Sequence, residues 1–209
     1  TAIREIGNDN SQTNMVALNI TGGEITGADG SDAVLVRETT APTVAISGGT
    51  FSSAVKKEYC ADGFVPVQNE NGTYGVDLIK VAAIGTTQYT SLKDAVDAAN
   101  ASSSNVTIKL LENITLTESL SIGGSVQITL NLNKKTLTLN GAQLIIQGTG
   151  NVIINGGALQ RTDVPESGIA DDYAILVTNG SSLIVGSTSS GKLTLTGKNG
   201  IYDDGGKLN

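Results

Sequence analysis

The chain has 209 residues, a formal net charge of −7 and 39% hydrophobic residues, with one Cys and no His. Without His, a Ser-His-Asp triad, a Cys-His pair and a His-ligated metal site are excluded, and one Cys excludes an intramolecular disulfide. The negative charge argues against nucleic acid as a partner. No stretch approaches the roughly 20 consecutive apolar residues of a membrane helix, so we expect no membrane insertion.

Short runs rich in Val, Ile, Leu and Thr recur along the whole chain, and each has the length of a β-strand. Asn-Gly and Gly-Gly pairs separate many of them and supply the positive φ angles that sharp turns need. This pattern predicts an all-β protein. We expect strands over residues 16–20, 33–36, 43–46, 106–111, 114–117, 126–130, 136–139, 144–146, 152–154, 174–177, 183–185 and 193–196.

Two architectures fit many short strands, an antiparallel sandwich or barrel and a parallel β-solenoid. Asn113, Asn133, Asn155 and Asn179 follow or end strand runs and recur every 20 to 24 residues, which is close to one turn of a solenoid. Stacked turns would place these side chains next to one another, so we expect Asn-to-Asn hydrogen bonds. The low aromatic content of 3% also favours a narrow aliphatic interior, and therefore the solenoid.

One helix is predicted, over residues 91–101. Its apolar residues Leu92, Ala95, Val96 and Ala99 share one face, and Ser91 is a suitable N-cap. A helix with such a narrow apolar face suits the open end of a solenoid, where the first turn would otherwise expose its interior and its strand edges.

Four segments resemble a known family. Residues 89–99 (YTSLKDAVDAA) with 106–113 (VTIKLLEN) resemble the start of right-handed parallel β-helix domains of the pectate-lyase-like group. Residues 130–139 (LNLNKKTLTL) and 46–52 (ISGGTFS) are similar to coils of large secreted surface proteins of Gram-positive gut bacteria, and residues 62–76 to the closing segment that often follows. The resemblance implies a right-handed parallel β-helix with a capping helix near residues 91–101.

The order of these segments predicts two consecutive modules. We expect residues 1–80 to hold the final coils and closing segment of one β-helix module, and residues 81–209 the capping helix and first coils of the next. Unfinished coils expose strand edges, so we expect self-association through them. The resemblance further implies a non-catalytic structural or adhesion module, extracellular or in the cell wall, with a polysaccharide or a host surface as possible ligand.

A glycan-active or glycan-binding domain is the alternative, because carboxylates and tyrosines gather in the longest excursion from the coils. A lyase would hold calcium with Asp171, Asp172 and Asp203 and use Arg161 or Lys192 as base, and a hydrolase would use two carboxylates. Tyr173 and Tyr202 flank the excursion and could bind sugar or cover coil edges. These residues form no recognised motif, so we expect no catalytic residues, resident metal or cofactor. The candidate glycan or ion groove comprises Arg161, Asp171, Asp172, Tyr173, Tyr202 and Asp203.

Overall fold

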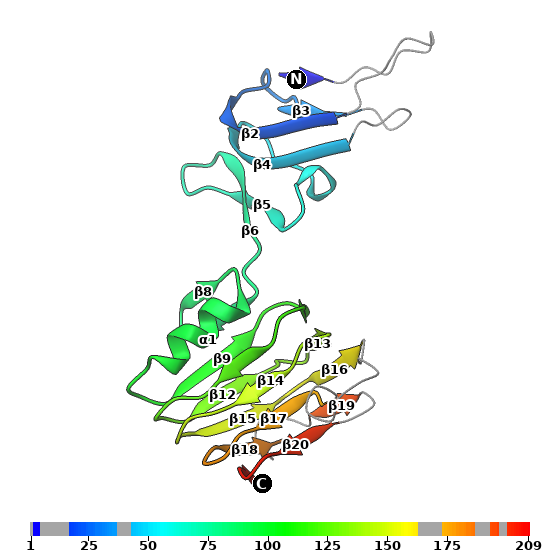
Figure 1. Cartoon of the computed structure of the whole chain (residues 1–209). Coiled ribbons are helices and arrows are strands. Elements are labelled where there is room, and N and C mark those ends of the chain that lie inside the picture. Colours follow the sequence, from blue (N-terminus) through cyan, green and yellow to red (C-terminus); the bar gives the residue numbers. More distant parts are fainter. Residues whose placement is uncertain (1, 5–16, 37–42, 163–172, 187–192, 197–199) are drawn as a thin grey trace. The chain divides into compact units, whose positions relative to one another are not determined.

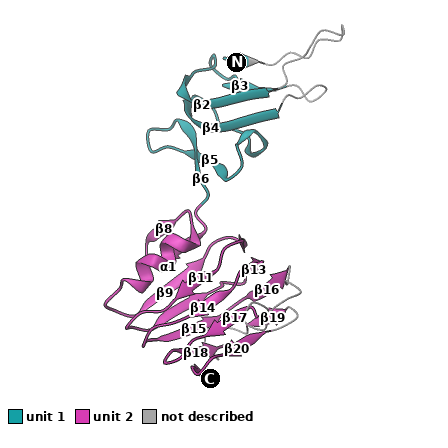
Figure 2. Ribbon diagram, viewed as in Figure 1, with its two compact units in different colours: residues 1–79 teal, residues 80–209 magenta. Residues whose placement is uncertain are grey.

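The structure is a computed structural model that describes residues 2–4, 17–36, 43–162, 173–186, 193–196 and 200–209. The chain divides into two compact units, Thr1–Ile79 and Lys80–Asn209 (Figure 2). Stacked parallel strands of the two units amount to about seven turns of β-solenoid. The expected all-β solenoid is therefore confirmed, and the sandwich alternative is wrong because the stacked strands run parallel (Figure 1).

Unit 1 contains two parallel strand pairs, a 3-10 turn and an antiparallel hairpin. Strand β2 pairs with β4 in parallel, and β1 pairs with β3. The glycine pair Gly48-Gly49 lets β2 and β4 approach, because a Cβ on Gly48 would lie 2.3 Å from the Thr21 carbonyl oxygen. The elements are β1 (Ile3–Arg4), β2 (Ala17–Ile25), β3 (Val34–Leu35), β4 (Thr43–Phe51), η2 (Lys57–Tyr59), β5 (Phe64–Gln68) and β6 (Tyr74–Leu78).

Unit 2 opens with a hairpin and a helix and continues as stacked three-strand turns. The opening elements are β7 (Ala82–Ile84), β8 (Thr87–Tyr89) and α1 (Leu92–Asn100). The turns are built from β9 (Val106–Leu110), β10 (Ile114–Leu116), β11 (Leu120–Ile122), β12 (Ile128–Asn131), β13 (Thr136–Asn140), β14 (Leu144–Ile146), β15 (Asn151–Asn155), β16 (Ala158–Thr162), β17 (Ile175–Val177), β18 (Ser182–Val185), β19 (Thr194–Thr196), β20 (Ile201–Asp203) and β21 (Lys207–Leu208).

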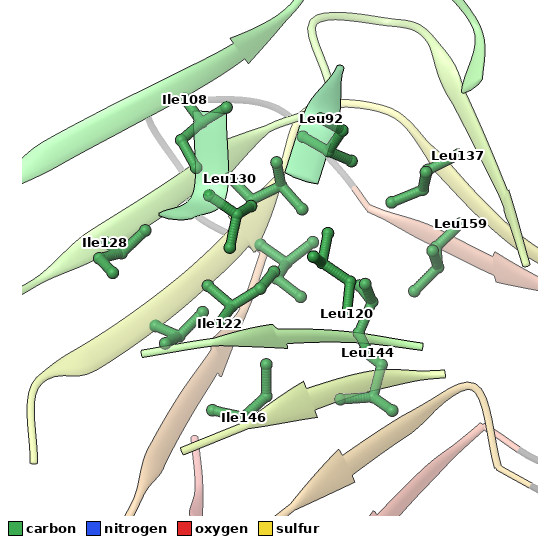
Figure 3. Packing of buried hydrophobic residues seen from close by; sticks show 14 of the residues in the cluster. Leu92, Ile108, Leu120, Ile122, Ile128, Leu130, Leu137, Leu144, Ile146 and Leu159 are labelled. Atoms are coloured by element: carbon green, nitrogen blue, oxygen red, sulfur yellow. The ribbon is translucent and has the colours of Figure 1, made fainter. Parts of the chain in front are cut away.

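Three parallel sheets form the walls of unit 2. The first sheet is ordered β21-β18-β15-β12-β9, the second β10-β13-β16-β19 and the third β11-β14-β17-β20. Alternate residues of each strand point inward, so that Ile108 is in register with Leu130 and Leu137 with Leu159. Figure 3 shows side chains from all three walls meeting in one aliphatic interior. Burial of this continuous stack is the main stabilising contribution to the unit.

Polar side chains at the corners join each turn to the next. Asn105, Asn113 and Ser119 accept hydrogen bonds at 2.9–3.1 Å from backbone N–H groups one turn further on. The Asn133 side chain donates to the Leu110 carbonyl at 2.8 Å. The expected Asn-to-Asn ladder is wrong, because Asn113 is in register with Thr136 rather than with Asn133. The Asn side chains instead bind backbone groups that the strand ladders leave open.

The predicted helix lies at the start of unit 2 and covers the first turn. Ser91 caps it by accepting from the Lys93 and Asp94 N–H groups, and its apolar face is buried against the core. Strand β7, which the sequence did not predict, pairs antiparallel with β9 and closes the edge of the first sheet. Within the described part of the chain, no helix is long and apolar enough to cross a membrane.

Candidate functional site

Arg161 lies in strand β16 and not, as expected, at the start of the excursion. It is in register with the inward-facing Leu139 and is only 5% exposed. Its Nη1 donates a hydrogen bond to the Tyr173 carbonyl oxygen. Gln143, also buried, donates from Nε2 to the same oxygen at 3.0 Å. Arg161 therefore fixes the corner that precedes β17, and in this position it is shielded from solvent.

Tyr173 and Tyr202 come together as expected from their flanking positions. Their rings are stacked with centroids 4.8 Å apart and an angle of 22° between the planes. Tyr202 is in register with Leu176, and both project from the outer side of the third sheet, half-buried. Each tyrosine uses one ring face on the other, so the pair offers two outward faces rather than one wide platform.

The acidic members of the predicted groove are only partly described. Asp203 is exposed at the end of β20, where its Oδ1 accepts a hydrogen bond from the Gly206 N–H at 2.6 Å. This carboxylate closes a tight turn. Asp171 and Asp172, together with Lys192, lie outside the described residues. Among the residues that the structure does describe, no three Asp, Glu or Cys side chains gather where they could hold a metal ion.

A second candidate region lies beside the first turn of α1, and sequence reasoning missed it. A hollow of about 280 Å³ separates the start of α1 from the segment that links β10 to β11. Leu116 and Leu120 form its apolar lining, and the polar lining comes from Ser91, Lys93, Thr115, Thr117, Glu118 and Ser119. A hydrogen bond from Lys93 to Asp97 raises the pKa of Lys93, so this amine stays protonated at neutral pH.

The signal for this hollow in the sequence is weak. Residues 113–119 read as a plain strand with hydroxyl-bearing neighbours, and nothing local shows that the helix covers only part of the first turn. The fit of α1 over β9 and β11 had to be seen before the exposed state of β10 became apparent.

Cys60 is the one thiol of the chain and lies in unit 1. Burial raises its pKa above the ordinary value, and the nearby Lys57 charge opposes this shift. Its Sγ is 3.7 Å from the Lys56 carbonyl oxygen, to which it donates a weak hydrogen bond. A thiol with a raised pKa is a poor nucleophile at neutral pH, which favours a packing role for this side chain.

Comparison of the chain with protein-family models, with curated proteins and with solved structures gave no match in any of the three.

Proposed function

We propose that this chain is a non-catalytic structural or adhesion module of a secreted or wall-attached bacterial surface protein, of the pectate-lyase-like β-helix kind. The main support is the way in which polar side chains are used at the corners of unit 2. Asn105, Asn113 and Ser119 each bind backbone of the following turn. Side chains committed in this way stabilise a stack of turns and are not free to handle a substrate.

The described members of the predicted groove are consistent with this proposal. Arg161 is buried and bound to a backbone carbonyl, so it is poorly placed to take a proton from a polysaccharide. Asp203 holds a turn. These contacts favour structural roles for both residues. The extracellular or cell-wall location, a polysaccharide or host surface as ligand, and self-association through unfinished coil ends belong to the same proposal.

An activity assay tests the non-catalytic part. The full chain would be incubated with pectin, polygalacturonate and xylan, with and without calcium, while reducing ends and unsaturated uronate products are followed. We expect no product above the protein-free blank. Product that increases in proportion to protein concentration, and that is lost in Asp203→Asn but kept in Asp204→Asn, would overturn the proposal in favour of a lyase or hydrolase.

Glycan binding without catalysis is the second candidate, and the stacked pair of Tyr173 and Tyr202 is the observation that favours it. Aromatic ring faces are apolar surfaces against which sugar C–H groups can pack. A glycan array read with and without calcium would test it with Tyr202→Ala and, as matched control, Tyr202→Phe. Binding that is lost in the Ala variant and kept in the Phe variant supports recognition through the ring.

A further inference from the structure

Strand β10 is the one first-turn strand of unit 2 whose outer edge has no cover among the described residues. Strand β9 is covered by β7, which pairs with it antiparallel. The edge of β11 is covered by Asn100, whose side chain donates to the Ser121 carbonyl at 3.1 Å and accepts from the Gly123 N–H at 2.9 Å. Strand β10 pairs with β13 alone. Its other edge therefore presents strand backbone groups that a further strand could bind.

The side chains of β10 show the same missing cover. Ile114 and Leu116 are in register with Leu137 and Leu139, which point into the core and are 0% exposed. Ile114 and Leu116 point the same way but remain only half-buried, because α1 does not extend over them. The hollow beside Leu116 and Leu120 marks the space that the helix leaves open.

Two carboxylates flank this edge. Glu112 precedes β10 and Glu118 follows it, and both are exposed. On the covered side of β10, Lys135 lies just before β13, and its Nζ is 3.7 Å from Glu112 Oε2. The strand that already pairs with β10 thus combines a basic residue at its start with leucines over Ile114 and Leu116. A strand on the other edge would meet the same acidic and aliphatic pattern.

We propose that the open edge of β10 is a docking site for an extended segment of a partner polypeptide. The segment carries aliphatic and hydroxyl-bearing residues in alternation and has basic residues beside them. Its backbone extends the second sheet by one strand, its aliphatic side chains cover Ile114 and Leu116, and its basic residues pair with the flanking glutamates.

A peptide with the sequence of residues 134–140, KKTLTLN, is a suitable probe because it reproduces the strand that β10 already accepts. The ¹⁵N-labelled full chain would be titrated with this peptide while amide shifts and hydrogen exchange are followed by NMR. We expect slowed exchange and shift changes confined to residues 112–120. The control peptides are a version with adjacent leucines and a version with Glu in place of both lysines.

The variant Glu118→Arg tests the charge contribution, with Asp204→Arg, which makes the same change on the last turn, as its matched control. Because exposed ion pairs contribute at most about 1 kcal/mol, we expect roughly three- to fivefold weaker binding for Glu118→Arg and no change for the control. Absence of protection at saturating peptide would overturn the proposal, as would equal protection by the adjacent-leucine peptide. Concentration-dependent protection of the same amides without peptide would overturn it in favour of pairing between two copies.

Discussion

The side-chain carbonyl oxygen of Asn100 accepts a hydrogen bond from the backbone N–H of Gly123 at 2.9 Å. Its amide nitrogen donates to the Ser121 carbonyl. One side chain at the end of α1 thus binds a donor and an acceptor of the β11 edge, as a neighbouring strand would. The helix covers the core with its apolar face and the strand edge with its last residue.

Replacement of Asn100 by Ala should destabilise unit 2. It leaves the buried Gly123 N–H and the Ser121 carbonyl without their partner, which costs about 1–3 kcal/mol. Urea unfolding followed by circular dichroism measures this loss. The exposed Ser103→Ala is the control and should change the free energy of unfolding by less than about 0.5 kcal/mol. Equal stabilities for the two variants would show that the Asn100 contacts are dispensable.

Gly123→Ala should be among the most damaging single substitutions in the chain. Gly123 has a φ of +149°, and a Cβ there would lie 1.6 Å from the Gln147 carbonyl oxygen of the next turn. Backbone on both sides of the contact would have to move, so we expect a loss above about 3 kcal/mol or failure to fold.

Gly141→Ala is the matched control for this substitution, because Gly141 also has a positive φ, of +70°, but open space around it. It should cost only about 1–2 kcal/mol from the backbone conformation. Thermal unfolding of both variants separates the contact between turns from the φ requirement, and equal losses would contradict the close-approach explanation.

Leu130→Ala should create a cavity in the middle of the stack. Leu130 is 0% exposed and lies between Ile108 and Ile154 of the neighbouring turns. Truncation of a fully buried Leu typically costs about 2–5 kcal/mol. Ile153→Ala, one strand away on the outer side of the first sheet, should cost clearly less. A chemical denaturation series gives both values, and the reverse ranking would contradict the assigned inner and outer faces.

The thiol of Cys60 should react slowly with iodoacetamide at pH 8.5. Burial raises its pKa, so the folded chain holds less thiolate than the unfolded chain between the ordinary thiol value and the raised one. The stability that this shift contributes is present below the ordinary value and is lost as pH rises through the raised one. Labelling of folded and urea-unfolded protein across pH 7.5–10.5, followed by mass spectrometry, checks the difference.

Lys57→Ala should slow the labelling of Cys60 further, because the Lys57 charge opposes the upward shift of the pKa. Lys134→Ala, in unit 2, removes the same charge elsewhere and should leave the rate unchanged. Faster labelling in Lys57→Ala would mean that access to the thiol, rather than its charge state, controls the reaction.

The parallel stack and its helix could be predicted from the sequence because both follow from side-chain periodicity. Leu137 and Leu139 alternate with threonines along one strand, and the buried face of α1 repeats at helical spacing. The hairpin of β7 and β8 escaped prediction because three-residue strands that contain two alanines carry little alternation.

The candidate groove was harder to predict. Arg161 interrupts the apolar alternation of β16, so it read as the start of a loop although its position faces inward. The expected Asn ladder failed for another reason, because turns of unequal length shift the register between Asn113 and Asn133. Which corner residues meet depends on that register, and composition alone does not determine it.

The corner hydrogen bonds of Asn100, Asn105, Asn113 and Ser119 all join residues 21 to 24 positions apart. Each such bond reaches the adjacent turn and goes no further, so stability accumulates along the axis as a sum of nearest-neighbour terms. Evolution can therefore lengthen or shorten such a protein by whole turns without redesign of the remainder, since each added turn brings both halves of its own attachment.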